Sequence, residues 1–352
     1  MNPHLHDDDR QPSATYTIDD LPFLTLAAAA HPRMERMLIL LSSQEIAEKE
    51  KTAARRLPHE LISSRDVPPS LWARETAEMT LARCCHAPTL HVLAGSPFHA
   101  VRVAVARNVF TPGAVLAELA RSDDGLISNT SAANPGLPLE DLEAAFLLGT
   151  VTARHGALLH PGVPQHIVDV AAEDPTWMVR CAAAAHARAT PAALARLAVD
   201  QDAVVRAAAA GNPALPPHLT PMLAADSDRH VRARLAGNLA CPAAAIDRLA
   251  HDPDPWVARA VAQAPALTEA AAVLLAADPT PEVRAKLAGN PACPARLLAA
   301  LAHQRQPVGV RSAVAANPAT PPPTVQRLAA DRSRTVREAA LQNAHSVVAG
   351  GE

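Results

Sequence analysis

Aromatic residues are scarce in this chain of 352 residues. Phe, Trp and Tyr together make up 2% of the sequence, although 49% of it is hydrophobic. A core with so few rings must be built from Ala, Leu and Val. Strands favour β-branched and aromatic residues, whereas Ala has the highest helix propensity. The composition therefore favours thin layers of closely packed helices over a wide sheet.

A surplus of positive charge is also missing. The formal net charge is −3, and from Ser96 to the C-terminus 22 Arg and Lys are matched by 22 Asp and Glu. Proteins that hold nucleic acid through its phosphates usually carry a basic surplus. The charge balance therefore argues against nucleic acid as the partner.

The sequence has neither a long uncharged apolar run nor a secretory signal. No run of about 18 apolar residues is free of charge and proline, which argues against a membrane span. The first residues, MNPHLHDDDR, are polar and acidic, unlike a signal peptide. The five cysteines lack the spacing of a disulfide framework. We expect a cytoplasmic protein.

Signatures of catalysis and of metal or cofactor binding are missing as well. The sequence contains no G-x-G-x-x-G, G-x-x-x-x-G-K-[ST], H-E-x-x-H or G-x-S-x-G. His160 and His186 are one repeat apart, and a separation of about 10 Å is too long for a shared zinc ion. We predict no catalytic residue, no metal site, no cofactor and no enzyme activity.

What the sequence does contain is a repeat of the form D-x-x-x-x-V-R-x-x-V-A-x-N-P-x-x-P-x-x-x-L-x-x-L-A. Its first apolar column recurs every 26 residues, with one step of 27. A constant period over so many copies is specific evidence for a repeat architecture. The column consists of Val101, Ile127, Ala153, Val179, Val205, Val231, Val257, Val283, Val310 and Val336.

Two polar columns follow the apolar one. The next residue is usually arginine: Arg102, Arg154, Arg180, Arg206, Arg232, Arg284, Arg311 and Arg337, with Ser128 and Ala258 as exceptions. Seven residues after the apolar column comes asparagine: Asn108, Asn134, Asn212, Asn238, Asn290, Asn317 and Asn343, with His160, His186 and Ala264 as exceptions. We predict that the Asn residues are structural caps.

Each repeat is expected to hold two short helices. An Asp such as Asp226 precedes the first helix as a cap, and Asn-Pro ends it, with the Asn in the left-handed cap conformation. A second proline such as Pro242 begins the second helix. A buried Leu closes it: Leu119, Leu197, Leu223, Leu249, Leu275, Leu301 or Leu328. Helices this short must pack on their neighbours.

This pattern resembles the leucine-rich repeat variant family, which is similar in style to HEAT repeats, from about Ser96 to Ala344. The resemblance implies an all-α, right-handed solenoid of about ten repeats, in which α-helices alternate with shorter, often 3₁₀, helices. The family's described example carries an N-terminal iron–sulfur cluster held by several Cys. In this chain only Cys84 and Cys85 lie near the N-terminal end of the repeats. We therefore do not predict an iron–sulfur cluster here.

The ends of the chain differ from the repeats. We expect a disordered tail over residues 1–20, an N-terminal helical cap over 21–80, a degenerate repeat over 81–95, the solenoid over 96–344 and a tail over 345–352. The cap has a second interpretation as a dimerisation or partner-docking helix. The last copy stops after Asn343, which leaves an apolar edge for a partner or a homodimer.

Two interpretations of the Arg column stay open. The guanidinium groups either bind carboxylates or phosphates of a partner, or pair with Asp of the same or the next repeat; we favour the second.

Trp177 and Trp256, just before the apolar column, either pack between repeats or act as binding hot spots for a partner. The irregular run around Ser128, residues 122–136, is either a tolerated departure from the repeat or a functional site built into it.

The leading functional hypothesis is a non-catalytic scaffold that binds another protein through an extended repeat surface. The first alternative is a nucleic-acid-binding, HEAT-like module, such as a base-repair protein, that uses the Arg column. The second is a repeat protein that carries a cofactor or metal.

Overall fold

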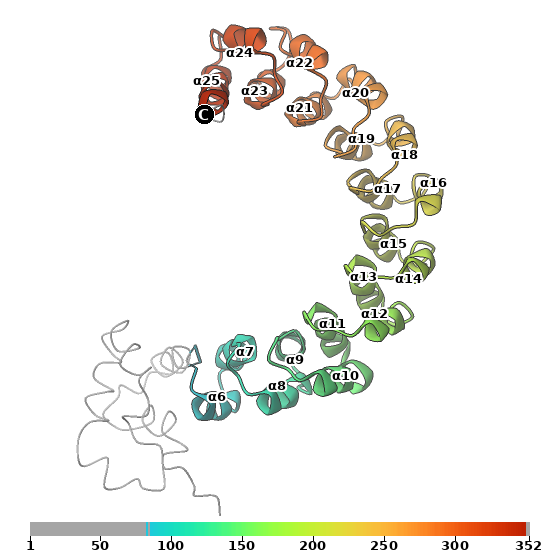
Figure 1. Cartoon of the computed structure of the whole chain (residues 1–352), viewed down its shortest axis with the longest axis vertical. Coiled ribbons are helices and arrows are strands. Elements are labelled where there is room, and N and C mark those ends of the chain that lie inside the picture. The colour runs from blue at the N-terminus through green and yellow to red at the C-terminus, as the bar shows by residue number, and fades with distance from the viewer. Residues whose placement is uncertain (1–81, 84, 350–352) are drawn as a thin grey trace, which may run out of the picture. The chain divides into compact units, whose positions relative to one another are not determined.

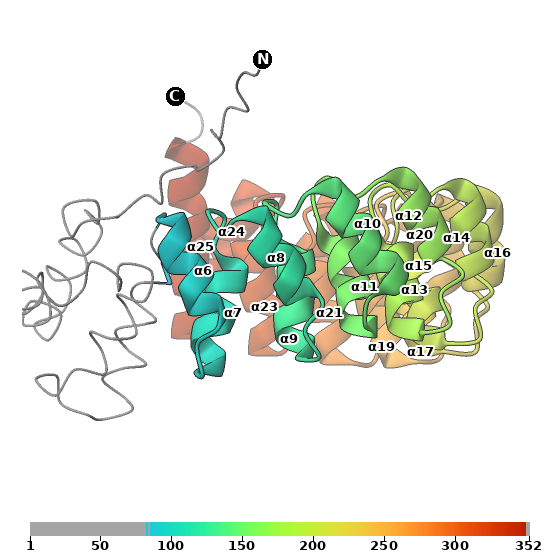
Figure 2. The same cartoon turned by 90° about the horizontal axis from the view of Figure 1, so that it is seen from below.

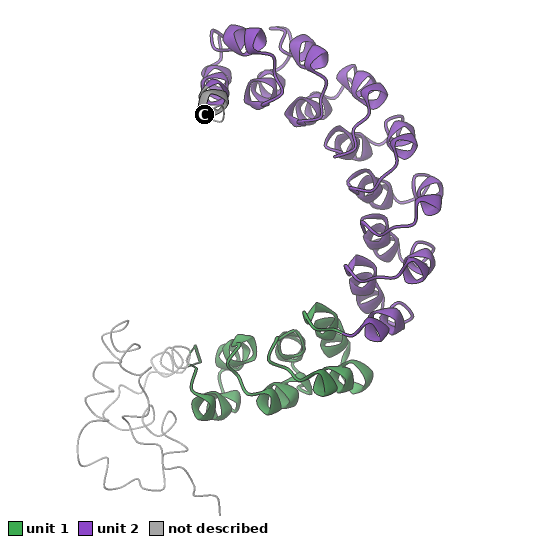
Figure 3. Cartoon of the chain, in the orientation of Figure 1, with its two compact units in different colours: residues 1–163 green, residues 164–352 purple. Residues whose placement is uncertain are grey.

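Every regular element of the chain is a helix, in a computed structural model that describes residues 82, 83 and 85–349. The predicted all-α fold class is therefore confirmed. The tail and cap expected over residues 1–20 and 21–80 lie outside the described residues. The chain divides after Val163 into two compact units (Figure 3), which are described separately below.

Unit 1 contains six helices among its described residues. They are α6 (Ala87–Ala94), α7 (His99–Arg107), α8 (Gly113–Ala120), α9 (Gly125–Ala132), α10 (Leu139–Leu148) and α11 (Val151–Leu159). Helix α9 packs between α7 and α11, and α8 packs between α6 and α10, so the helices form two rows (Figures 1 and 2). We call α7, α9 and α11 first helices, and the others second helices.

Unit 2 continues the same alternation. Its first helices are α13 (Trp177–Ala185), α15 (Ala203–Ala210), α17 (Arg229–Ala236), α19 (Pro255–Ala262), α21 (Pro281–Gly289), α23 (Val308–Ala316) and α25 (Arg334–Ala349). Its second helices are α12 (Gln165–Ala171), α14 (Pro191–Leu197), α16 (Thr220–Leu223), α18 (Ala243–Leu249), α20 (Glu269–Ala276), α22 (Ala295–Leu301) and α24 (Pro322–Leu328). Within this unit the first helices pack side by side along the concave row, and the second helices form the convex row (Figures 1 and 3).

The apolar column forms the centre of both units. Each of its residues lies in a first helix and is at most 1% exposed. In α17 the column residue Val231 is followed one turn later by Leu235, which is also fully buried. The seven closing Leu residues of the second helices are each at most 7% exposed. Ala, Val and Leu therefore supply the core, as the composition predicts.

The first helices begin later and end differently than the sequence suggests. Asp228, not Asp226, is the N-cap of α17 and accepts the backbone N–H of His230 at 2.7 Å. The expectation of a left-handed Asn is wrong, because Asn290 and Asn317 have extended backbones, with φ −77 and ψ 123 in Asn290. Each precedes a proline, which disfavours helical geometry in the residue before it.

The second helices are short, as predicted, but nearly all are α-helical. The 3₁₀ turn Pro217–Leu219 leads into α16 and is the exception among the described second helices. Three prolines, Pro216, Pro217 and Pro221, crowd this segment. Because proline lacks the N–H needed for helical hydrogen bonds, α16 begins only after Pro216 and Pro217, and it holds Pro221 in its first turn, where no such bond is needed. In most other second helices a proline is the N-cap, as Pro242 is in α18, whereas Thr190 and Thr268 are the N-caps of α14 and α20.

The last first helix does not stop at its Asn. Helix α25 continues through Asn343 to Ala349, into the segment expected as a tail. Asn343 is followed by Ala and not by proline, so nothing in the local sequence breaks the helix.

Helices α9 and α11 approach each other closely at Gly156. A β-carbon on Gly156 would lie 2.2 Å from the carbonyl oxygen of Asn129, a backbone atom that cannot turn away. We expect Gly156→Ala to lower the free energy of unfolding by about 1–3 kcal/mol, because the two helices must separate. Gly289 is the matched control, since an added β-carbon there meets nothing within 4 Å. Urea unfolding that shows equal effects for Gly156→Ala and Gly289→Ala would contradict this packing.

Candidate functional site

The Asn column joins each repeat to the one before it. The amide nitrogen of Asn238 donates to the carbonyl oxygens of Ala210 and Asn212, both at 2.8 Å, and its side-chain oxygen accepts the N–H of Ala240 at 2.8 Å. Both amide donors are thereby used. The same two donations are made by Asn134, Asn212, Asn290, Asn317 and Asn343. The column is therefore a ladder of inter-repeat hydrogen bonds.

The Asn ladder is interrupted at Ala264, which is fully buried and has no side-chain donor. The sequence Ala264–Leu267 differs from Asn212–Leu215 only at its first residue. We expect Ala264→Asn to restore the bonds to the carbonyl of Asn238 and from the N–H of Ala266, and to raise the free energy of unfolding by about 1 kcal/mol. Urea denaturation measures the change. With Ala266→Asn as control, a less stable Ala264→Asn variant would refute the ladder at this position.

All the arginines of the Arg column hold the loop in front of their own helix. Arg232 Nη1 donates to the carbonyl oxygen of Asp226 at 2.8 Å, and Arg102 Nη1 donates to that of Ser96 at 2.7 Å. Equivalent donations come from Arg154, Arg180, Arg206, Arg284, Arg311 and Arg337. This side of the guanidinium is therefore occupied by the chain itself.

Four of these arginines also pair with an Asp of the next repeat, 20 residues further on. The pairs are Arg180–Asp200, Arg206–Asp226, Arg232–Asp252 and Arg311–Asp331, with Nε–Oδ2 distances of 2.6–2.8 Å. Each is bidentate, because Nη2 reaches the second carboxylate oxygen. These guanidinium groups are held within the repeat stack and are not available to a partner.

Arg311–Asp331 is the most deeply buried of the four pairs. The side chains of Arg311 and Asp331 are 1% and 2% exposed. The hydrogen bond from Arg311 lowers the pKa of the Asp331 carboxyl, and the same contact raises the pKa of Arg311. At Asp200 burial is the largest single influence and raises the pKa, but the hydrogen bonds from Arg180 and from the Asp202 backbone, together with the charges of Arg180 and Arg206, outweigh it, so the net shift is downward.

The Arg–Asp ladder has a gap around α19. Ala258 stands in place of the arginine, and the side chain of Asp278 on the next repeat accepts the backbone N–H of Thr280 at 2.7 Å. Arg284 bonds the Gln306 side-chain oxygen at 3.1 Å instead of a carboxylate. The repeat built on α19 therefore lacks both the Arg and the Asn, and depends more on apolar packing than its neighbours.

The same repeat and the one before it share a cluster of aromatic and basic side chains on their first helices. Trp256 on α19 is 46% exposed. The guanidinium carbon of Arg259 lies 4.8 Å from its ring centroid, that of Arg229 lies 5.9 Å away, and the His230 ring meets it at 6.0 Å in an edge-on arrangement. We call these four residues, which come from α17 and α19, the Trp256 cluster. Cation–π contacts hold its arginines against the ring.

Two arginines on this face have no acidic partner. Arg259 and Arg234 form no ion pair or hydrogen bond with any residue between 85 and 349. Arg234 lies beside Gly211, where a β-carbon would sit 3.3 Å from its Nε. Burial raises the pKa of the Cys181 thiol on α13, and the charge of Arg234 opposes that shift, so Arg234 extends along the face toward α13. The N–H donors of both guanidinium groups are open to a partner.

Trp177 lies at the start of α13 on the same row of first helices and is 47% exposed. Neither tryptophan is buried between repeats. Of the candidate binding residues proposed from sequence, the structure leaves these two accessible, whereas it engages the Arg column internally. Arg229, Arg234 and Arg259 were missed because they do not recur. Their positions could have indicated them, since they lie on first helices at positions where the residue differs between repeats.

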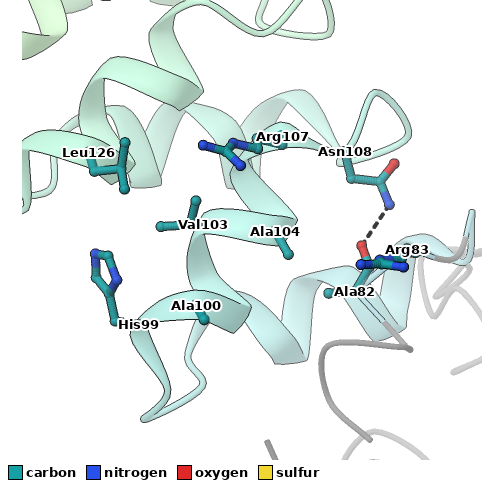
Figure 4. A pocket seen from close by; sticks show the side chains of 9 residues that line it. All are labelled: Ala82, Arg83, His99, Ala100, Val103, Ala104, Arg107, Asn108 and Leu126. Carbon is teal, nitrogen blue, oxygen red and sulfur yellow. Dashed lines mark hydrogen bonds between the residues drawn. The ribbon is translucent and has the colours of Figure 1, made fainter. Parts of the chain in front are cut away.

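The first-helix row of unit 1 carries an open hollow of about 600 Å³ (Figure 4). Its floor is made of small apolar side chains of α7, and basic residues lie around the rim. His99 of the rim pairs with Asp124, Nε2 to Oδ2 at 2.9 Å. Asn108 closes one end by donating to the Ala82 carbonyl at 2.9 Å. The lining residues are Ala82, Arg83, His99, Ala100, Val103, Ala104, Arg107, Asn108 and Leu126.

The irregular run around Ser128 forms a polar contact between α9 and α11. Ser128 Oγ lies 2.9 Å from Thr152 Oγ1, and Asn129 Nδ2 lies 2.8 Å from His155 Nδ1. Burial lowers the pKa of His155. These groups satisfy one another, so Ser128 replaces the arginine without leaving a free binding group.

The cysteines and histidines give no metal site in the described part of the chain, where no three His, Cys, Asp or Glu side chains gather. Cys241 and Cys293 are buried, and burial raises the pKa of each thiol to about 11. His160 and His186 replace the ladder Asn; the Nδ1 of each accepts the N–H two residues later at 3.0 Å. Between residues 85 and 349 no helix is long and apolar enough to cross a membrane.

Comparisons with known proteins find similar chains among solved structures. No protein-family model and no curated protein matches the chain. Among solved structures it is similar to a leucine-rich repeat variant with a novel repetitive structural motif, at 24% identity and a TM-score of 0.43, over 64% of this chain and 88% of that one. It is also similar to two engineered proteins, at 16% and 18% identity and TM-scores of 0.27 and 0.14; the matches cover 88% and 72% of this chain and 98% and 95% of those proteins.

Proposed function

We propose that this chain is a non-catalytic scaffold that binds another protein through the first-helix face of unit 2. One observation carries the proposal: the recurring polar side chains of the repeat are engaged with the chain itself, whereas the exposed positions of the first helices differ from copy to copy. At the position just before the apolar column, α15, α17, α19 and α21 present Val204, His230, Trp256 and Glu282. Such variation on a regular scaffold is what a specific binding surface needs.

The Trp256 cluster is the proposed centre of this surface. Trp and Arg are enriched among residues that dominate binding energy at protein interfaces. Here Trp256 and Arg229 are exposed and Arg259 is half-buried, and the arginines are held by the ring before a partner arrives, which reduces the entropy lost on binding. The convex row offers less, because the hollow of about 580 Å³ beside α18 and α20 has its acidic side chains and its arginine paired, with Arg296 against Glu269 and Thr268 against Asp247.

The proposal includes a cytoplasmic location, which is supported by five cysteines without the spacing of a disulfide framework.

Site-specific photo-crosslinking in the producing cells tests the proposal. A benzophenone side chain at Val204, which is 55% exposed on α15, is expected to capture a specific protein. The same probe at Val199, which is 62% exposed after the convex helix α14, is expected not to. Trp256→Ala combined with Arg259→Ala should reduce the Val204 yield about tenfold or more. Equal capture at the two positions, or a yield that the double substitution leaves unchanged, would refute the binding face.

A further inference from the structure

We infer that the partner segment bound by this face is an extended acidic peptide whose carboxylates recur every third residue. This inference rests on the proposed function and specifies the chemistry of the partner. It is carried by three cations on consecutive first helices, none of which has an acidic partner within the described chain: Arg234 on α17 and Lys286 on α21, which are exposed, and Arg259 on α19, which is half-buried.

The three cations occupy nearly the same register of their helices. Arg234 and Lys286 lie three residues after their apolar-column residue, and Arg259 lies two residues after its own. Because the helices pack side by side, with axes about 8–10 Å apart, the cations form a line across the row. Among the residues of the helices α17, α19 and α21, Glu282 is the one acidic residue. The line is therefore net positive.

An extended peptide matches this spacing. A polyproline II segment rises about 3.1 Å per residue with three residues per turn, so side chains of every third residue share one face about 9 Å apart. Carboxylates at that interval would meet one cation on each successive helix. Arg259 is the strongest of the three sites, since its guanidinium is stacked on Trp256 and keeps its in-plane donors for a bidentate contact.

The acidic rim of the face disfavours a nucleic acid in the same place. Asp202, Asp228 and Asp254 line the N-terminal ends of α15, α17 and α19, and their side chains are 41%, 34% and 25% exposed. A nucleic acid carries a charge on every phosphate and would be repelled along this rim. A peptide with two uncharged residues between its carboxylates avoids that repulsion.

Fluorescence anisotropy with three labelled 15-residue peptides tests the inference on the full chain. The first peptide repeats Pro-Pro-Asp, the second has the same composition with its Asp residues in one block, and the third repeats Pro-Pro-Asn. We expect the first peptide to bind about tenfold or more tightly than the other two, with an affinity that falls as salt is added.

A matched pair of variants locates the site. Replacing Arg234, Arg259 and Lys286 by Ala is expected to weaken the first peptide about tenfold or more. Replacing the exposed convex-row arginines Arg196, Arg248 and Arg327 by Ala should change its binding by less than about twofold. Thermal unfolding of both triple variants checks that the fold is intact, since the first variant also loses the stacking of Arg259 on Trp256.

Three outcomes would overturn the inference. They are equal binding of the spaced and blocked peptides, an unchanged affinity in the Arg234, Arg259 and Lys286 variant, or a 15-nucleotide single strand that binds more tightly than the first peptide and displaces it. Continued capture of a protein at Val204 in any of these cases would retain the proposed function and reject only this partner chemistry. Loss of both would reject both.

Discussion

Asp331→Ala is expected to lower the free energy of unfolding by about 3–5 kcal/mol, because it leaves the buried guanidinium of Arg311 without its carboxylate. Nε and Nη2 of Arg311 both donate to that carboxylate, at 2.8 and 2.9 Å. The two side chains are almost fully buried, so water cannot replace the lost partner. Urea-induced unfolding followed by circular dichroism measures the change.

Two comparisons separate the pair from ordinary packing. The double substitution Arg311→Met and Asp331→Leu removes both charges and is expected to recover most of the lost stability, since apolar replacements of buried pairs are often neutral. The exposed pair Arg334–Glu338, with side chains 83% and 53% exposed, is the control, and Arg334→Ala should cost less than about 1 kcal/mol. An Asp331→Ala variant no less stable than Arg334→Ala would contradict this assignment.

Asn238→Ala is expected to lower the free energy of unfolding by about 3 kcal/mol. The substitution removes both donors that reach the carbonyls of Ala210 and Asn212, two buried bonds between neighbouring repeats. It also leaves the N–H of Ala240 without its acceptor. Each buried polar group left without a partner costs about 1–3 kcal/mol. The midpoint and slope of urea unfolding report the loss.

A conservative variant tests the chemistry of that position. Asn238→His is expected to cost less than half as much, because His160 and His186 occupy the same column and their Nδ1 atoms accept the N–H two residues later. Equal losses for the Ala and His variants would contradict a role for the side-chain acceptor at this position.

The periodic part of the fold was readable from the sequence, because each repeated residue has the same neighbours in every copy. The apolar column predicted the buried face of each first helix, and the closing Leu predicted the second. Proline at fixed places predicted where the helices break, as before α18 and after Asn290. The missing proline after Asn343 explains why α25 runs on.

Other features depend on contacts between repeats and could not be read from one copy. The sequence did not distinguish an Arg that binds a partner from one that pairs with the Asp 20 residues further on, as Arg206 does with Asp226. The Asn was expected to cap its own helix, whereas it donates to the preceding repeat. The Trp256 cluster follows from which side chains are left exposed once those contacts are made. The right-handed course of the stack stays a prediction.

Residue-resolved amide hydrogen exchange tests the central claim, that these columns hold successive repeats together. The N–H groups of Ala214, Ala240 and Ala292 each donate to a ladder Asn at 2.8–2.9 Å, and that of Ala266 follows Ala264, which has no such side chain. We predict slow exchange at Ala214, Ala240 and Ala292, and exchange at least about tenfold faster at Ala266. Uniform exchange at all four positions would contradict the claim.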